Sequence, residues 1–249
     1  MHLRNTLLAL AALALTATAA TQAQRLPGGV HPEAYTLTLT PDLQAATFTG
    51  EETIVLTLDA PSTTITLNAA EIKFLSVKSG SQTATVSLDA EKEQATFTFP
   101  QALPAGKATL SISYTGILND KLRGFYLSRT AKRNYAVTQF EPTDARRAYP
   151  SFDEPALKAT YDITLIVDKG DTAISNTQIV SDTPGPIAGK HTLHFATTPK
   201  MSTYLVAFLV GDFKCTEGKS DGVPIRGCAT PDKVALTKFS VEAAKYILH

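Results

Sequence analysis

The sequence predicts an all-β fold in which antiparallel strands form a sandwich or curved, saddle-like sheets. Three observations lead to this prediction: side chains alternate in twos, the alternating runs are short, and turn-forming residues separate them. Tyr35, Leu37 and Leu39 face one way, while the threonines between them face the other. Most of the chain shows no helical period between these runs, so we expect sheets that pack on sheets.

The alternation recurs in order along the chain. The runs with apolar residues at alternate positions in the first half are 35–39, 54–58, 65–67, 86–88, 97–99 and 110–114. A second strand-rich stretch follows the Pro-containing segment 149–155, with expected strands over 161–167, 173–180, 192–196 and 204–210. Pro, Gly, Asp and Ser residues lie between many of these runs and can supply the turns that antiparallel neighbours need.

The last segment, residues 231–249, predicts a short helix. Its apolar residues, among them Phe239, Val241 and Tyr246, approximate a 3.6-residue period, and Pro231 stands where a helix can start. An apolar helical face needs something to cover it. We expect either that it belongs to a further domain or that it packs back onto the sheet.

Residues 1–23 are typical of an export signal. Arg4 supplies a positive start, residues 7–15 are an apolar run of Leu and Ala, and small residues continue to Ala23. Cleavage is expected after Ala23, or at residue 19 or 20. The apolar run is shorter than the ~20 residues of a membrane span, although an uncleaved anchor or a buried helix is an alternative. We therefore expect an exported protein, periplasmic or extracellular, with no membrane span after cleavage.

The charge balance argues against nucleic acid as a partner. The chain has 23 basic and 23 acidic residues, so its formal net charge is +0. Binding to a polyanion or to an anionic membrane surface needs a positive field, which this composition does not provide.

The two cysteines are predicted to form a disulfide across a hairpin. The Asp-Gly pair at 221–222 favours a two-residue turn, which sets Ser220 opposite Val223. Counting outward from that register places Cys215 opposite Cys228 at a non-hydrogen-bonded site, where Cα atoms approach to about 4.5 Å. An exported protein meets oxidising conditions that let such a pair form. The alternative is two free, buried thiols.

The most specific stretch is residues 138–160, TQFEPTDARRAYPSFDEPALKAT. It resembles the signature segment of the aminopeptidase N family of zinc metalloaminopeptidases. The likeness continues through 176–181, 198–205, 210–213 and 221–226, and so covers nearly all of the mature chain. The resemblance implies that residues 24–229 form the amino-terminal β-domain of such an enzyme. It also implies that residues 230–249 are the first helix of a thermolysin-like catalytic domain.

The resemblance assigns substrate binding to Gln139 and Glu141. In that family these positions lie on a loop that reaches into the active site of the next domain. Glu141 would bind the free α-amino group of the peptide substrate, and Gln139 would line the pocket for its first side chain. A partly desolvated carboxylate is a natural charge-assisted partner for a terminal ammonium group. Without the resemblance, a Glu before Pro is usually a solvated loop residue.

The charged residues around this pair are interpreted as structural. Asp144, Arg146, Arg147, Asp153 and Glu154 form a dense cluster, for which we expect an ion-pair network that holds the loop and its turns.

The residues that would bind zinc are not found in this sequence. A zinc aminopeptidase needs His-Glu-x-x-His on a helix and a further Glu ligand, but none of the five histidines is followed by Glu. His191 and His194 are three apart on a predicted strand and face opposite ways, so they cannot share a metal. We expect no catalytic or metal-ligating residue in this chain, and zinc only in the complete enzyme.

The family's Gly-Ala-Met-Glu-Asn loop is not found either, and we expect both elements to lie beyond His249. The chain is then an amino-terminal portion, inactive alone, whose partners are the catalytic domain and the free amino terminus of a peptide. The main alternative is a non-catalytic secreted β-sandwich binding module that docks a partner through the helix from Pro231. A carbohydrate-binding sandwich is disfavoured because the sequence has no Trp.

Overall fold

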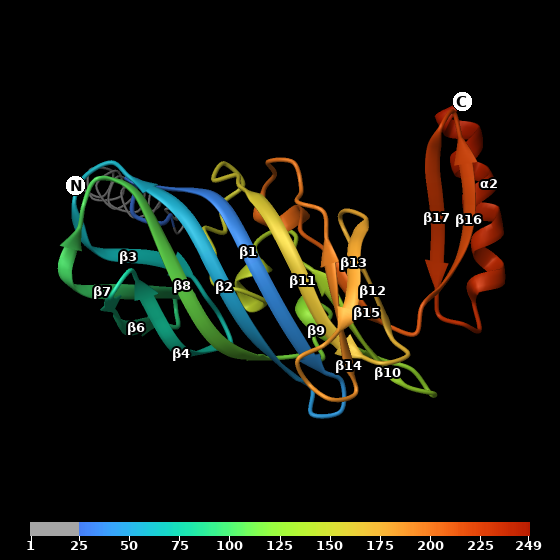
Figure 1. The fold of residues 1–249 in the computed structure, drawn as a ribbon, viewed down its shortest axis with the longest axis horizontal. Helices are drawn as coiled ribbons and strands as arrows, with labels where there is room; N and C mark the ends of the chain where they lie inside the picture. The colour runs from blue at the N-terminus through green and yellow to red at the C-terminus, as the bar shows by residue number, and fades with distance from the viewer. Residues whose placement is uncertain (1–24) are drawn as a thin grey trace, which may run out of the picture.

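The computed structural model describes residues 25–249 and shows curved β-sheets with one α-helix in the carboxy-terminal segment (Figure 1). The all-β prediction with a short carboxy-terminal helix is confirmed. The predicted export signal, residues 1–23, lies outside the described residues. Within residues 25–249, no helix has the length and apolar character needed to cross a membrane.

An eight-stranded, strongly twisted sheet forms the centre of the molecule (Figure 1). Across the sheet its strands are β13 (Ile179–Pro184), β14 (Lys190–Phe195), β11 (Thr160–Asp168), β1 (Val30–Asp42), β2 (Thr47–Leu58), β8 (Gly106–Ile117), β4 (Ile72–Ser79) and β5 (Gln82–Thr83). Alternate side chains of these strands are buried, as the sequence pattern predicts. One face of the sheet therefore forms most of the core.

One pair of central strands departs from the antiparallel prediction. β1 and β11 run parallel, with Tyr35 beside Tyr161 and Leu37 beside Ile163. No short turn joins them, because more than a hundred residues separate them, so no hairpin constrains their direction. The rings of Tyr35 and Tyr161 stack with 5.0 Å between centroids and so reinforce this contact.

Two smaller sheets cover the core face of the large one. One contains β3 (Ser62–Asn68), β7 (Gln94–Leu103) and β6 (Thr85–Asp89), and the other contains β12 (Thr172–Ser175), β15 (Phe208–Gly211), β10 (Asn134–Gln139) and β9 (Gly124–Arg129). Aromatic rings join the layers: Phe74 of β4 packs on Phe97 of β7, and Phe48 of β2 packs on Phe125 of β9. The second small sheet carries the strand that leads into the signature segment.

The segment predicted as one strand over 173–180 is divided between two sheets. β12 ends at Ser175 and β13 begins at Ile179. Between them the Asn176 side chain donates to the carbonyl of Leu205 and accepts from the amide of Ala207. These side-chain hydrogen bonds replace strand pairing at this point. A period of two along the sequence does not predict such a break.

The strand predicted over 204–210 is shorter than expected. A 3-10 turn, η2 (Thr203–Leu205), precedes β15, which begins at Phe208. The hydroxyl of Thr203 donates to the buried carboxylate of Asp153 at 2.7 Å. This contact holds the turn against the signature segment.

A hairpin and a helix form the carboxy-terminal unit, which stands beside the sheets at one end of the molecule (Figure 1). Its elements are β16 (Lys214–Ser220), β17 (Val223–Ala229), the 3-10 turn η3 (Val234–Leu236) and α2 (Thr237–Leu248). The helix packs onto the hairpin through Val241, while Phe239 and Tyr246 are exposed, and its expected membership of a further domain stays a prediction. Val241 is 2% exposed, and a Cβ added to Gly218 would lie 2.6 Å from it.

The hairpin register is the one that the Asp-Gly turn predicts. Ser220 lies opposite Val223 and Cys215 lies opposite Cys228. The two cysteines are joined by a disulfide, with 4.1 Å between their Cα atoms. The bond ties together the ends of the hairpin nearest the main body.

Candidate functional site

The candidate site is the turn that follows β10. Gln139 ends the strand, and Phe140 and Glu141 come directly after it. The exposed fraction alternates here: Gln139 and Glu141 are exposed, whereas Phe140 is 2% exposed. The strand's period of two therefore continues through Glu141, so both candidate side chains lie on the outer surface while the ring between them enters the core.

Phe140 anchors this segment to the core. Its ring packs edge to face against Tyr149, with 6.0 Å between centroids, and against Phe208 of β15, with 5.8 Å. The amide of Asp144 donates to the Phe140 carbonyl at 2.8 Å, which closes the turn that contains the cis Glu141–Pro142 peptide bond. The backbone beside Glu141 is thus held on both sides.

Neither candidate side chain is engaged elsewhere in the described chain. The Glu141 carboxylate and the Gln139 amide make no side-chain hydrogen bond or ion pair with residues 25–249. A carboxylate that is exposed, unpaired and mounted on a fixed backbone can accept hydrogen bonds from a cationic ligand.

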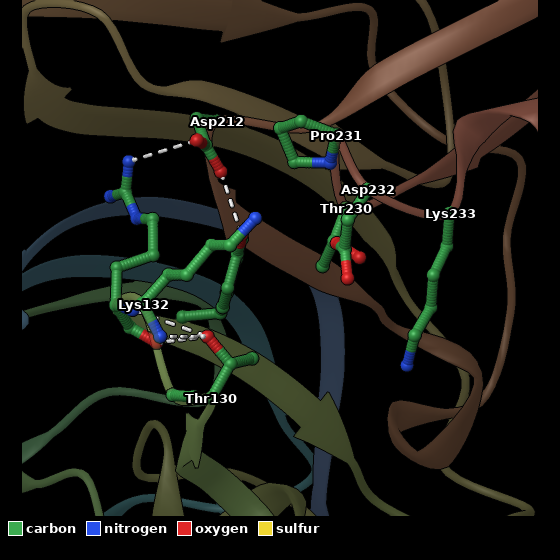
Figure 2. A pocket seen from close by; sticks show the side chains of 10 residues that line it. Thr130, Lys132, Asp212, Thr230, Pro231, Asp232 and Lys233 are labelled. Atoms are coloured by element: carbon green, nitrogen blue, oxygen red, sulfur yellow. Dashed lines mark hydrogen bonds and ion pairs between the residues drawn. The ribbon is translucent and has the colours of Figure 1, made fainter.

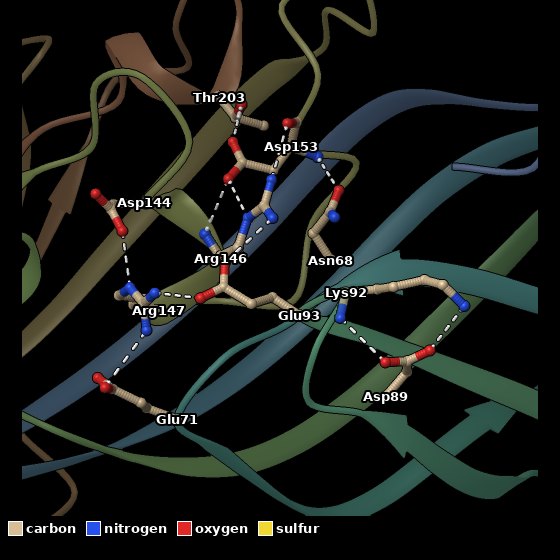
Figure 3. A network of polar contacts seen from close by, with 10 residues as sticks. All are labelled: Asn68, Glu71, Asp89, Lys92, Glu93, Asp144, Arg146, Arg147, Asp153 and Thr203. Carbon is tan, nitrogen blue, oxygen red and sulfur yellow. Dashed lines mark hydrogen bonds and ion pairs between the residues drawn. The ribbon is translucent and has the colours of Figure 1, made fainter. Parts of the chain in front are cut away.

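Two arginines hold the segment behind the candidate site (Figure 3). They lie in the 3-10 turn η1 (Ala145–Arg147), and both side chains are less than a tenth exposed. Arg146 donates through Nε to Asp153 at 3.0 Å, and Arg147 donates through Nε to Asp144 at 2.7 Å. Both arginines also contact Glu93, from the turn before β7.

The structure thus confirms an ion-pair network among four of the five charged residues and adds Glu93 and Glu71 to it. The expectation that Glu154 belongs to the same network is wrong. Glu154 instead accepts from Arg25 at 3.1 Å and from the amide of Leu26 at 2.6 Å, because it lies on the turn facing the start of the described chain. Glu154 therefore ties down that start.

A cavity of about 350 Å³ lies elsewhere, at the junction with the carboxy-terminal unit (Figure 2). The turn between β9 and β10 and the loop 230–233 line it. Arg133 spans its wall, with ion pairs to Asp171 at 2.7 Å and Asp212 at 3.6 Å. Gln139 and Glu141 are not among the lining residues, because they lie at the other end of β10.

The described residues do not fit a zinc site. No three His, Cys, Asp or Glu side chains in residues 25–249 are grouped so that they could hold a metal ion. His191 contacts Asp182 at 2.7 Å, and His194 contacts Asp162 at 3.6 Å. The two imidazoles thus pair with different carboxylates.

Comparison with known proteins decides the family. The family model described as the Peptidase M1 N-terminal domain matches residues 31–205, which contain Gln139, Glu141 and both network arginines. The chain belongs to this family. The resemblance seen in the signature segment is confirmed at the level of an M1 aminopeptidase amino-terminal domain.

Several curated aminopeptidases resemble this M1 domain. Aminopeptidase 2 of Candida albicans is 42% identical over 229 residues, which are 90% of this chain and 25% of that protein. The puromycin-sensitive aminopeptidase of Caenorhabditis elegans is 36% identical over 236 residues, with shares of 90% and 25%. Aminopeptidase N of Acetobacter pasteurianus is 36% identical over 233 residues, with shares of 91% and 65%. The chain spans about a quarter of the length of the first two.

Sequence reasoning missed two residues that shape this part of the M1 domain. The first is Phe140, which anchors the segment that carries Gln139 and Glu141. The sequence feature that could have revealed it is an apolar residue between two polar ones at the end of a strand. The second is Glu52, which is buried on β2 of the eight-stranded sheet. The sequence feature that could have revealed it is a glutamate at a position that alternation assigns to the core, between Phe48 and Ile54.

Proposed function

We propose that this chain is the substrate-anchoring domain of an exported zinc-dependent aminopeptidase that removes amino-terminal residues from peptides. In this proposal Glu141 accepts hydrogen bonds from the free α-amino group of the peptide. Gln139 lines the pocket for the first side chain. Binding the terminal ammonium group sets the register that leaves one residue beyond the bond to be cleaved.

One observation carries the proposal. Within the residues that match the M1 family, Glu141 is an exposed, unpaired carboxylate on a backbone that the buried Phe140 ring and the Asp144 amide hold in place. The neighbouring carboxylates Asp144 and Asp153 are already paired with arginines, so they are poorly suited to bind a ligand. Among the carboxylates of the signature segment, Glu141 is the one available to a cation.

Zinc and the hydrolytic step are assigned to residues outside this chain, because the described residues do not fit a metal site. We therefore expect this chain alone to be inactive. A catalytic domain is its proposed partner, with α2 as the proposed first helix of that domain. Export rests on the signal-like residues 1–23. Amino-terminal sequencing of the protein from a secreting host tests it, with Gln24 as the expected first residue.

Peptide binding tests the role of Glu141 directly. The purified chain is titrated by NMR with a tripeptide whose amino terminus is free and with the same peptide acetylated. Only the free peptide is expected to shift the amide signals of residues 138–144, and Glu141→Gln should weaken its binding about tenfold or more, because a charge-assisted hydrogen bond contributes ~1.5–3 kcal/mol. Equal binding of both peptides would contradict the proposal.

A matched variant controls for the loss of a surface charge. Glu217 lies exposed on β16, far along the chain from the candidate site, so Glu217→Gln removes the same charge elsewhere. We expect this variant to bind the free peptide as the wild type does. If both variants weaken binding equally, the attraction is a general charge effect and Glu141 has no specific role.

A second candidate function is a non-catalytic secreted binding module. The outer face of α2 favours it, since Phe239, Tyr246 and Ile247 are 81%, 86% and 80% exposed. The nucleotide sequence downstream of the codon for His249 separates the two functions. The aminopeptidase proposal expects an open frame that encodes Gly-Ala-Met-Glu-Asn and then His-Glu-x-x-His. A stop codon directly after His249 would favour the binding module.

A further inference from the structure

Glu52 places a carboxyl group in the middle of the hydrophobic core. It lies on β2, in the register of Phe48 and Ile54, and is 3% exposed. Its neighbours across the sheet are Leu37 on β1 and Ile112 on β8, both at most 1% exposed. Both cross-strand neighbours are therefore apolar and cannot form an ion pair or a hydrogen bond with the Glu52 carboxyl group.

The polar atoms of this region lack partners within the described chain. Both carboxyl oxygens of Glu52 are buried without a hydrogen bond among residues 25–249. The same holds for the hydroxyl groups of Tyr114, Tyr149 and Tyr161. Most buried polar side-chain atoms in proteins have a partner, and leaving one without costs about 1–3 kcal/mol. Several such atoms in one core therefore point to partners other than the protein atoms of residues 25–249.

Ring contacts and strand register bring these groups together. Tyr149 packs edge to face against Tyr35 and Tyr161, with 6.0 and 6.3 Å between centroids. Tyr114 lies over Gly50, two residues before Glu52 on the same face, and a Cβ at Gly50 would lie 2.7 Å from the Tyr114 hydroxyl. Burial, and after it the proximity of Glu52, raise the pKa of Tyr114 well above its ordinary value.

We infer that Glu52 is a neutral carboxylic acid at physiological pH and that, with the hydroxyls of Tyr114, Tyr149 and Tyr161, it forms a buried site for water molecules. Water can donate to and accept from each of these groups at once, as buried waters in proteins do. A lone carboxylate in an apolar core loses its hydration, which favours the protonated form. Burial accordingly raises the pKa of Glu52 well above its ordinary value.

Among residues 25–249, the charged and titratable groups around the site leave no cation for Glu52. Asp153, on the covering segment, is already paired with Arg146 and accepts from Thr203. Tyr35, on β1, accepts from the amide of Phe152. The phenols from β8, β11 and the segment after η1 carry no charge at neutral pH, and burial is the largest cause that raises the pKa of each.

Tyr149 links the site to the candidate loop through ring contacts. Tyr149 contacts Tyr161 on one side and Phe140 on the other, and Phe140 is the anchor between Gln139 and Glu141. Loss of the Glu52 proton would place a negative charge in the core on which this anchor packs. The inference does not depend on the proposed aminopeptidase function, since it concerns the core alone.

Infrared spectroscopy of the purified chain tests whether the Glu52 carboxyl group is protonated. The carbonyl stretch of a protonated carboxylic acid is expected in the wild type at pH 7 and is expected to disappear in Glu52→Gln. The neighbouring Glu51, exposed on the opposite face of β2, provides the control, and Glu51→Gln should keep the band. Absence of this carbonyl band from the wild-type spectrum would mean that Glu52 is ionised and would overturn the inference.

The pH dependence of unfolding gives a second readout. A raised pKa in the folded state means that, above the ordinary carboxyl pKa, the unfolded chain releases the Glu52 proton while the folded chain keeps it. Stability should therefore fall as pH rises, by up to about tenfold in the unfolding equilibrium constant per pH unit. Glu52→Gln should remove this component and Glu51→Gln should keep it. Equal pH profiles for Glu52→Gln and the wild type would overturn the inference.

Magnetic relaxation dispersion of water tests the bound molecules. It counts water molecules that stay in the protein for long times. The wild type and Glu52→Gln, which keeps polar atoms at this position, should hold the same number. Glu52→Leu should hold at least one fewer. Equal numbers in Glu52→Leu and the wild type would show that no water binds at Glu52.

Discussion

Gly124 lies directly against the side chain of Arg147, so that a Cβ added to the glycine would lie 2.7 Å from the Cβ of the arginine. Gly124 begins β9 opposite Gln139, and its φ of 68° is in the left-handed region. The contact presses η1 against the strand pair that carries the candidate site. It therefore links the structural arginines to the position of Gln139.

Gly124→Ala is expected to destabilise the chain, because the new methyl group would collide with Arg147 and a left-handed φ costs an alanine about 1 kcal/mol. Gly80→Ala is the matched control, since Gly80 has a φ of 55° but nothing within 4 Å of its added Cβ. Urea denaturation should show Gly124→Ala to be less stable than Gly80→Ala by about 1–3 kcal/mol. Equal losses would mean that Arg147 moves aside freely.

Asp153→Asn tests the buried ion pair behind the site. Asp153 is 2% exposed and holds both Arg146 and Thr203, so the variant leaves the buried Arg146 guanidinium group with Glu93, at 3.3 Å, as its remaining charge partner. We expect a loss of about 3–5 kcal/mol in the free energy of unfolding. Asp89→Asn breaks the exposed pair with Lys92 and should lower stability far less, because solvent screens that pair. A similar small loss for both variants would contradict a supporting role for Asp153.

Phe140→Ala tests the anchor of the candidate loop. Removing a ring that is 2% exposed should cost about 3–5 kcal/mol of stability. Phe239→Ala removes a ring that is 81% exposed and should change stability by about 0.5 kcal/mol or less. At a temperature where Phe140→Ala remains folded, it should also weaken binding of the free tripeptide, because Glu141 loses its fixed backbone. Unchanged peptide binding would show that the anchor does not position Glu141.

The hairpin disulfide predicts how the cysteines react. In the native chain folded under oxidising conditions, Cys215 and Cys228 should resist alkylation until a reductant is added. The double variant Cys215→Ser with Cys228→Ser should lose about 2–4 kcal/mol, with amide exchange increased in β16 and β17. Mass spectrometry detects the labelling. Ready alkylation of both residues in the native protein would contradict the pairing.

The sequence alone was sufficient for much of the fold. Alternation located β1, β2, β8 and β11, because a half-buried strand shows its period whatever its partners are. The Asp-Gly turn determined the hairpin register, since a two-residue turn leaves one way to count. The signature segment was enough to recognise the family. It also made Gln139 and Glu141 the candidate residues, and their role stays a prediction.

Only the tertiary structure decided which strands meet. Three findings depend on contacts between residues far apart in sequence. They are the parallel pairing of β1 with β11, the break between β12 and β13, and the presence of Glu93 in place of Glu154 in the arginine network. Local periodicity carries no information about such partners, because it reports which face of a strand is buried and not what covers it. For the same reason the strand pattern alone does not distinguish Glu52 from the other residues of β2. Its burial among tyrosines from three other segments is visible only in the tertiary structure.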